Sequence, residues 1–192
     1  MTPMNYIPSR PIIVSGIKHC GKSTLGRRLA AELGLEFHDL DDLVVDLCRE
    51  NRGGPDAITW EPREIYRRLG KSGFQELETG ALKRLSKRGG LYVLALGGGT
   101  PDNPDALPVL SGLGIMVYLY EEAEVLFSRI AARGIPPFLD EKAPWESFLE
   151  LFRHRDTLYR STADLVVELN GADVQDGAAR IRKSLQEMDN VR

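Results

Sequence analysis

The sequence predicts an α/β fold in which helices cover both faces of a five-stranded parallel sheet. Apolar runs and helix-forming runs alternate along most of the 192 residues, and the central apolar runs are continuous rather than interrupted by polar residues. Continuously apolar strands are typical of parallel sheets that are covered on both faces. We therefore expect three layers, α/β/α, within a single domain spanning residues 1–192.

The expected elements follow from these runs in chain order. Short apolar runs predict strands at Ile12–Ser15, Leu35–Phe37, Leu91–Leu96, Ile115–Tyr120 and Asp164–Glu168. Helical periodicity and end signals predict helices at Lys22–Leu33, Asp41–Glu50, Glu61–Leu69, Gly73–Lys87, Ala123–Arg133, Trp145–Ser161 and Val174–Met188. Ligands of such sheets bind beyond the carboxyl ends of the strands, so the residues that follow each strand are the candidates for chemistry.

Composition excludes several classes of protein. Hydrophobic residues make up 42% and charged residues 28% of the chain, as in average globular domains. A net charge of −3 gives no reason to expect a nucleic-acid or membrane partner, and no apolar run approaches the roughly 18 residues of a membrane span. The start, residues 1–10, lacks the apolar core of a signal peptide, and the two cysteines have neither disulfide nor metal-ligand spacing. We expect a cytoplasmic protein, with a monomer as the simplest assembly.

The segment from Gly16 to Thr24 has the pattern G-x-x-x-x-G-K-S-T of a phosphate-binding loop. It lies between the first predicted strand and a helix, which is the context that the motif requires. Backbone N–H groups of the loop and the helix dipole would bind phosphates, Lys22 would add charge near the β- and γ-phosphates, and Ser23 would offer a hydroxyl to Mg²⁺. The sequence therefore predicts binding of ATP or GTP. The alternative is an ordinary glycine turn before a helix.

Acidic side chains follow the second predicted strand. Asp39, Asp41 and Asp42 fall within four residues. Mg²⁺ prefers oxygen ligands, and a carboxylate can also orient or deprotonate an attacking hydroxyl. The competing interpretation is that Asp39 or Asp41 only caps the following helix.

Glycines and basic residues mark two further candidate sites. Gly97, Gly98 and Gly99 follow the third strand, where their backbone can approach a ligand closely. Arg129 precedes a proline-rich loop and can stack on a base or neutralise phosphate, and the later helix carries a basic cluster that includes Arg155. A solvated helix face is the alternative for both arginines.

Two loops interrupt the alternation of strands and helices. Asn51 to Pro62 contains Gly53-Gly54-Pro55 and joins two helical pieces. Gly134 to Pro144 contains Pro136-Pro137 and could close over a nucleotide as a lid. A plain surface connection is the alternative for the second loop.

Together these motifs resemble those of the shikimate kinases, small ATP-dependent kinases with a P-loop fold like that of the nucleoside monophosphate kinases. The resemblance runs from Ile12 to about Val167. Its most specific parts are the phosphate loop with Leu25-Gly26-Arg27, Phe37-x-Asp39-x-Asp41, Gly73-Phe74-x-x-Leu77-Glu78, Leu96-Gly97-Gly98-Gly99, and Arg155-x-x-Leu158-Tyr159 with Ala163-Asp164.

The resemblance implies that the 3-hydroxyl of shikimate attacks the γ-phosphate of ATP. It makes Lys22, Asp39 and Asp41 catalytic, with Asp41 as the base and with Ser23 and Asp39 associated with Mg²⁺. ATP would contact Arg129 and the loop residues Gly16, His19, Cys20, Gly21, Lys22, Ser23 and Thr24. Shikimate would contact Asp41, Gln75, Gly97, Gly98, Gly99 and Arg155. Residues 43–73 would cover the substrate, and residues 134–144 would form the lid.

The chain departs from the family pattern at four places. Gln75 stands where the family has an arginine that binds the substrate carboxylate, and Pro136-Pro137-Phe138 stands where the lid carries Arg-Pro-Leu. His19 replaces a usual glycine, and the segment Leu43–Gly73 is longer than typical. Three hypotheses follow: a shikimate kinase with an unusual site, a related kinase for another hydroxylated metabolite, or a nucleotide-binding regulator without catalysis.

Overall fold

A computed structural model of the chain describes residues 6–52, 60–136 and 139–190. Five strands form one sheet: β1 (Ile12–Ser15), β2 (Glu36–Asp39), β3 (Tyr92–Ala95), β4 (Ile115–Tyr120) and β5 (Leu165–Glu168). They lie in the order β2-β3-β1-β4-β5, and every neighbouring pair is parallel. The predicted five-stranded parallel sheet is confirmed.

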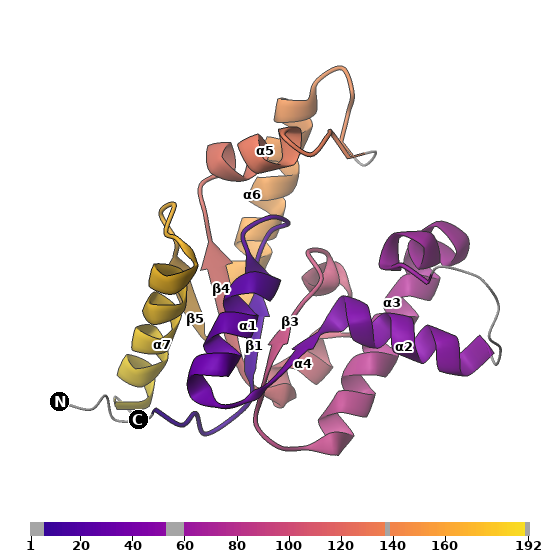
Figure 1. Ribbon diagram of the computed structural model, residues 1–192. Coiled ribbons are helices and arrows are strands. Elements are labelled where there is room, and N and C mark those ends of the chain that lie inside the picture. The colour runs from indigo at the N-terminus through magenta and orange to yellow at the C-terminus, as the bar shows by residue number, and fades with distance from the viewer. Residues whose placement is uncertain (1–5, 53–59, 137–138, 191–192) are drawn as a thin grey trace.

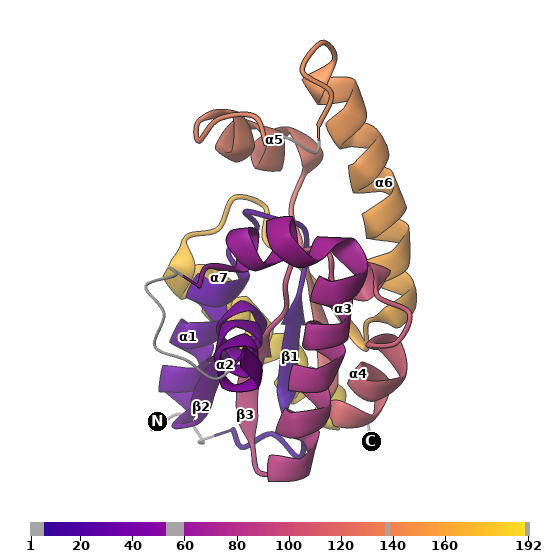
Figure 2. The same ribbon diagram turned by 90° about the vertical axis from the view of Figure 1, so that its right-hand side faces the viewer.

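Seven α-helices and a 3₁₀ turn accompany the sheet in the described residues. They are α1 (Lys22–Leu33), α2 (Leu40–Arg52), α3 (Pro62–Arg88), η1 (Thr100–Asp102), α4 (Leu107–Leu113), α5 (Ala123–Ala131), α6 (Pro144–Thr162) and α7 (Val174–Asn190). Figure 1 shows α1 and α7 on one side of the sheet and α2, α3 and α4 on the other, and Figure 2 shows the same layers from the side. Within the described residues, no helix is both long and apolar enough to span a membrane.

Each buried strand contributes to two hydrophobic cores. In β1, the side chains of Ile12 and Val14 belong to the core under α1, α5, α6 and α7, whereas Ile13 belongs to the core under α2, α3 and α4. Because successive side chains of a strand point to opposite faces, a strand between two helical layers must be apolar at every position. This is the physical basis of the continuous apolar runs in the sequence.

Several element boundaries differ from the prediction. β2 extends to Asp39, so that this carboxylate lies at the carboxyl end of the sheet. The predicted helices Glu61–Leu69 and Gly73–Lys87 are the two arms of the single helix α3, which bends where Gly70 has φ 69° and ψ −174°. Helix α4 was not predicted, because its seven residues begin beside Pro108 and lie between turn-forming residues.

Candidate active site

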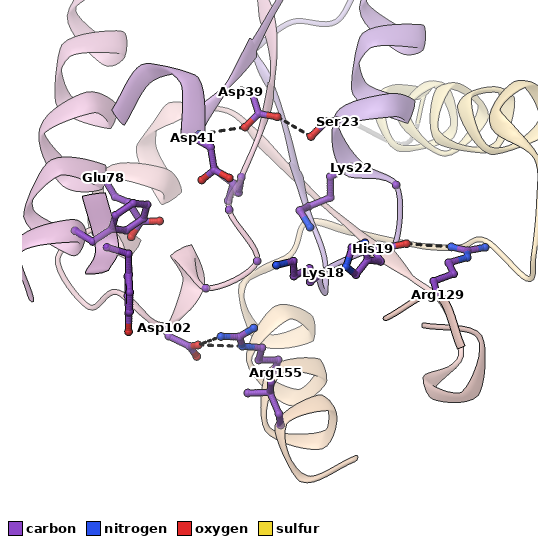
Figure 3. A pocket seen from close by; sticks show the side chains of 18 of the residues that line it. Lys18, His19, Lys22, Ser23, Asp39, Asp41, Glu78, Asp102, Arg129 and Arg155 are labelled. Carbon is purple, nitrogen blue, oxygen red and sulfur yellow. Dashed lines mark hydrogen bonds and ion pairs between the residues drawn. The ribbon is translucent and has the colours of Figure 1, made fainter. Parts of the chain in front are cut away.

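A cleft of about 900 Å³ opens at the carboxyl ends of the strands. Its walls come from the phosphate loop, the end of β2, α3, the glycines after β3, the end of α5, and α6. Figure 3 shows the labelled side chains converging on this cleft from both sides. The site predicted at this edge of the sheet is therefore one continuous space, large enough for a nucleotide and a second small molecule.

Two glycines of the phosphate loop adopt positive φ angles, which residues with a side chain rarely adopt. Gly16 has φ 151°, and a Cβ atom there would lie 2.6 Å from Cys20 Sγ and 2.9 Å from the carbonyl oxygen of Leu119. Gly21, with φ 98°, forms the N-cap of α1 without a side-chain cap. Uncapped N–H groups at this helix start remain available to an anion.

Lys22 is only 9% exposed and lies inside this loop. Its Nζ donates hydrogen bonds to the carbonyl oxygens of Gly16 at 2.8 Å and of Ile17 at 3.2 Å. These bonds hold a buried ammonium group next to the place where phosphates would bind. Phosphate oxygens can exchange for the two carbonyls at little cost, because both are strong acceptors for a charged donor.

His19 lies on the other flank of the loop with φ 69°, an uncommon value for a residue with a side chain. Its carbonyl oxygen accepts a hydrogen bond from Arg129 Nη1 at 3.2 Å, and its Nδ1 lies 3.3 Å from Arg133 Nη1. Burial and the charge of Arg133 lower the pKa of His19, so the ring is neutral at pH 7. Arg129 also pairs with the buried Glu121 at 3.3 Å, which fixes its guanidinium beside the loop.

Ser23 and Asp39 place two side-chain oxygens next to each other. The Ser23 hydroxyl donates to Asp39 Oδ2 at 2.6 Å, and Asp39 Oδ1 accepts from the backbone N–H of Asp41 at 3.1 Å. Among the described residues no group of three or more His, Cys, Asp or Glu side chains could hold a metal ion. Mg²⁺ needs no such cage, because it is usually bound by one or two protein oxygens together with substrate phosphates and water. Ser23 and Asp39 fit that requirement.

Asp41 lies across the cleft from the phosphate loop, beside the first glycine after β3. A Cβ atom on Gly97 would lie 3.3 Å from Asp41 Oδ1 and 3.4 Å from Glu78 Oε1. Burial is the main cause that raises the pKa of Asp41, and the charge of Asp39 adds to it, while Lys22 and Lys18 act in the opposite direction. A carboxylate whose basicity is raised is suited to accept a proton.

Glu78 belongs to the motif Gly73-Phe74-x-x-Leu77-Glu78, to which the sequence assigned no separate role, but it is 4% exposed and lines the cleft. It accepts hydrogen bonds from Thr100 Oγ1 at 2.7 Å and from Asn103 Nδ2 at 3.3 Å. Burial raises its pKa in spite of these two bonds. Its sequence context carried a signal, since Glu78 falls on the same face of α3 as the buried Leu82 and Leu85. An acid on a buried helix face is therefore the signal that could have marked this position as a candidate.

Gly98 and Gly99 are held by residues of α6. The hydroxyl of Tyr159 donates to the carbonyl oxygen of Gly98 at 2.5 Å. A Cβ atom on Gly99 would lie 3.4 Å from Arg155 Nη2. Arg155 itself is oriented by Asp102, whose Oδ2 lies 3.1 Å from Nε and 3.0 Å from Nη2.

Comparison with known proteins assigns the family. A family model described as shikimate kinase matches residues 18–186. The chain belongs to the shikimate kinase family. It is 37% identical over 179 residues to the shikimate kinase of Halorhodospira halophila, covering 93% of this chain and 94% of that protein. It is also 39% identical over 156 residues to the shikimate kinase of Chromohalobacter salexigens, covering 81% of each chain.

Solved structures of the family have the same fold. Shikimate kinase from Acinetobacter baumannii in complex with shikimate matches with a TM-score of 0.76 and 32% identity, covering 95% of both chains. Shikimate kinase from Aquifex aeolicus matches with a TM-score of 0.72 and 29% identity over 92% of this chain and 96% of that one. The predicted family, P-loop fold and class of activity, phosphoryl transfer to a hydroxyl group, are confirmed.

Most of the family residues named from the sequence line the cleft. These are His19, Gly21, Lys22, Ser23, Thr24, Asp39, Asp41, Gln75, Gly97, Gly98, Gly99, Arg129 and Arg155. Gly16 and Cys20 are not among the lining residues, and the Cys20 side chain packs in the core beneath the loop. The sequence reasoning passed over Lys18, Lys71 and Asp102, which also line the cleft.

The structure describes only parts of the two predicted covering segments. Of residues 43–73, Tyr66 and Lys71 line the cleft, whereas 53–59 lie outside the described residues. In the predicted lid 134–144, positions 137–138 lie outside the described residues, and Leu139 is buried with its N–H bonded to the carbonyl oxygen of Pro136 at 3.0 Å.

Proposed function

We propose that this protein transfers the γ-phosphate of ATP to the 3-hydroxyl group of shikimate. The observation that carries the proposal is the arrangement of the cleft, in which the phosphate loop faces Asp41 and the glycine segment Gly97–Gly99. Donor and acceptor would meet between these groups. The Acinetobacter relative that was solved with shikimate supports the choice of acceptor.

The phosphate loop would bind the triphosphate of ATP. Backbone N–H groups at the start of α1 would donate to its oxygens, and Lys22 would leave the carbonyls of Gly16 and Ile17 to contact the transferring group. Arg129 would lie at the nucleotide end, on the far side of His19 from Lys22.

Ser23 and Asp39 would hold Mg²⁺, which would neutralise charge on the phosphate oxygens when bound. The Ser23 hydroxyl and the Asp39 carboxylate are already neighbours, joined by a hydrogen bond of 2.6 Å, and both oxygens would become available to the ion when that bond is exchanged. Asp39 also anchors the first turn of α2 through the N–H of Asp41. The same side chain would therefore position both the ion and the base.

Asp41 would accept the proton of the attacking hydroxyl. The hydroxyl oxygen forms a bond to the γ-phosphorus as the bond to the β,γ-bridging oxygen breaks, and the proton passes to an oxygen of Asp41. Because burial raises the pKa of Asp41, its affinity for this proton exceeds that of an ordinary surface aspartate. Phosphoryl transfer depends mainly on positioning and charge neutralisation, which these residues would supply.

The remaining expectations complete the proposal. ATP and Mg²⁺ would serve a single kinase domain over residues 1–192, acting as a monomer in the cytoplasm without nucleic-acid or membrane partners. Residues 43–73 would cover the acceptor, and residues 134–144 would close over the nucleotide.

One observation favours a second candidate, a kinase for a different hydroxylated metabolite. Gln75 offers a neutral amide where the family carries an arginine, and its Nε2 donates to the carbonyl oxygen of Asp102 at 3.4 Å. A neutral amide at this position would suit an acceptor that has no carboxylate. Retention of Lys22, Asp39 and Asp41 argues against a regulator that lacks catalysis.

A coupled assay of ADP release tests the proposal. Wild-type protein with Mg-ATP should turn over shikimate, and Asp41→Asn should lower kcat by about 10²–10⁴-fold, as expected when a general base is lost. Absence of shikimate-dependent ADP release at millimolar shikimate, with ATP binding intact, would refute it. Gln75→Arg separates the two candidates, because it should improve the affinity for shikimate only if shikimate is the acceptor.

A further inference from the structure

Three acidic groups line the acceptor end of the cleft. Asp41, Glu78 and Asp102 line it, and Arg155 is the arginine that faces the glycine segment there. Asp102 contacts Arg155 at 3.0 and 3.1 Å, and it also lies 3.3 Å from His154 Nε2 through its other oxygen. Much of the charge of Arg155 is thus offset before any ligand binds. A second cation nearby would strengthen the binding of an acceptor that carries a carboxylate.

Lys18 is placed to supply that cation. It lies in a variable position of the phosphate loop, and its backbone packs against the glycine segment. A Cβ atom on Gly98 would lie 3.4 Å from the backbone nitrogen of Lys18 and 3.6 Å from the Cβ of Lys18. Similarly, a Cβ atom on Gly99 would lie 3.4 Å from Arg155 Nη2. Two adjacent glycines are therefore flanked by two cationic residues, one from the phosphate loop and one from α6.

The orientation of Lys18 agrees with this role. Figure 3 shows Lys18 between Lys22 and Arg155, on the opposite side of the loop from Arg129. Its charge also acts on Asp41, where it opposes the effect of burial on the pKa of that carboxyl. The exposed side chain has a flexible four-carbon stem, which can bring the ammonium group over the glycines without moving the loop.

We propose that Lys18 binds the carboxylate of the acceptor together with Arg155, supplying the charge that Gln75 lacks. This inference rests on the proposed function, because it takes the acceptor to be the acid shikimate. An ammonium group and a guanidinium group on either side of the glycine segment would clamp one carboxylate, and backbone N–H groups of that segment can complete its hydrogen bonds. Lys18 would set specificity for acids over neutral alcohols.

Lys71 is the rival source of charge. It also lines the cleft, one helical turn before Gln75 on α3. Unlike Lys18, it is not among the atoms nearest to Gly97, Gly98 or Gly99. The test must therefore compare the two lysines directly.

The experiment measures kcat and KM by ADP release with two acceptors, shikimate and its methyl ester, which lacks the negative charge. Wild-type protein, Lys18→Met, Lys18→Arg, Lys71→Met and Lys83→Met are compared, and the last is a control for loss of a lysine on α3 that does not line the cleft. Circular dichroism and the KM for Mg-ATP show that each variant is folded and binds nucleotide.

Loss of one charged hydrogen bond corresponds to about 1.5–3 kcal/mol, or roughly ten- to a hundredfold in affinity. Lys18→Met should therefore raise the KM for shikimate by that factor and leave the KM for the ester nearly unchanged. Lys18→Arg should keep the preference for the acid, and Lys83→Met should behave as wild type.

Three results would overturn the inference. In the first, the ratio of the KM for the ester to the KM for shikimate is the same in Lys18→Met as in wild type. In the second, Lys18→Met lowers kcat at saturating shikimate with an unchanged KM, which would place Lys18 on the transferring phosphate instead. In the third, Lys71→Met alone abolishes the discrimination between acid and ester. A wild-type protein that does not phosphorylate shikimate refutes the proposed function, and the inference falls with it.

Discussion

Tyr159 offers a test of how the glycine segment is held in place. Its side chain is 1% exposed, and its hydroxyl donates a hydrogen bond of 2.5 Å to the carbonyl oxygen of Gly98. The two residues are 61 positions apart in the chain, so this bond ties α6 to the loop after β3. Tyr159→Phe removes the hydroxyl and leaves the ring in place.

The loss of stability can be estimated from this contact. A neutral hydrogen bond contributes about 0.5–1.5 kcal/mol net, and a buried acceptor left without a donor costs about 1–3 kcal/mol. Gly98 is partly exposed, so water can reach its carbonyl, and the lower part of these ranges applies. A loss of about 1–2 kcal/mol corresponds to a decrease in Tm of about 2–8 °C for a chain of this size.

Tyr118→Phe is the matched control. Tyr118 is also 1% exposed, and its hydroxyl donates to Asp156 Oδ1 at 2.9 Å, away from the cleft. Asp156 keeps its pair with Arg160 at 3.0 Å, so the control also loses one part-buried hydrogen bond and leaves no charge without a partner.

Calorimetry and steady-state kinetics distinguish the two variants. Both should lose stability, but only Tyr159→Phe should lower kcat/KM for shikimate, by about tenfold, because a displaced glycine segment misplaces the acceptor. The KM for Mg-ATP should not change in either variant. If Tyr159→Phe and Tyr118→Phe have the same kinetics with shikimate, the hydrogen bond to Gly98 does not position the acceptor.

Three further predictions concern the phosphate loop and the base. The pKa of Asp41 is raised in the free protein, so the acidic limb of the kcat/KM–pH profile should lie above the ordinary aspartate range. Asp41→Asn should raise the free energy of unfolding at pH 7, and this increase should shrink as the pH falls through the pKa of folded Asp41; a difference in Tm between variant and wild type that stays constant across the pH range would contradict this. Ser23→Ala should raise the KM for Mg-ATP and weaken its dependence on free Mg²⁺, since the hydroxyl beside Asp39 is lost, and an unaltered Mg²⁺ titration would argue against its role. Gly16→Ala should destabilise the fold by about 1–3 kcal/mol in chemical denaturation, because its Cβ would lie 2.6 Å from Cys20 Sγ, and wild-type stability would show that the loop relaxes freely.

The features that the sequence predicted best are those set by residues close together in the chain. The phosphate loop is a continuous segment whose glycines dictate its backbone, so pattern alone was enough to place Lys22 and Ser23. The sheet was equally accessible, because burial on both faces leaves a continuous apolar run in each central strand. Even the break in α3 was foreseen as a boundary near Gly70, although the structure shows a bend between two arms rather than a loop.

Residues whose roles depend on long-range contacts were harder to find. Glu78 becomes part of the site through Thr100 and Asn103, which are 22 and 25 positions away. Asp102 gains its role only when α6 brings Arg155 against η1. Periodicity places a side chain on a face of its own helix, but it does not say which other element meets that face.

The role proposed for Lys18 could not be predicted from the phosphate-loop motif. In the pattern G-x-x-x-x-G-K-S-T, Lys18 occupies a variable position, so the motif assigns it no role. Taken by itself, Gln75 in place of an arginine indicates an acid-recognition site that has lost a cation. The fold brings Lys18 against Gly98, next to the Gly99 that Arg155 approaches, so a lysine of the phosphate loop would supply the charge that Gln75 lacks. Because electrostatic recognition depends on where charges lie in space rather than on which element carries them, the substitution at Gln75 is compatible with an acidic acceptor.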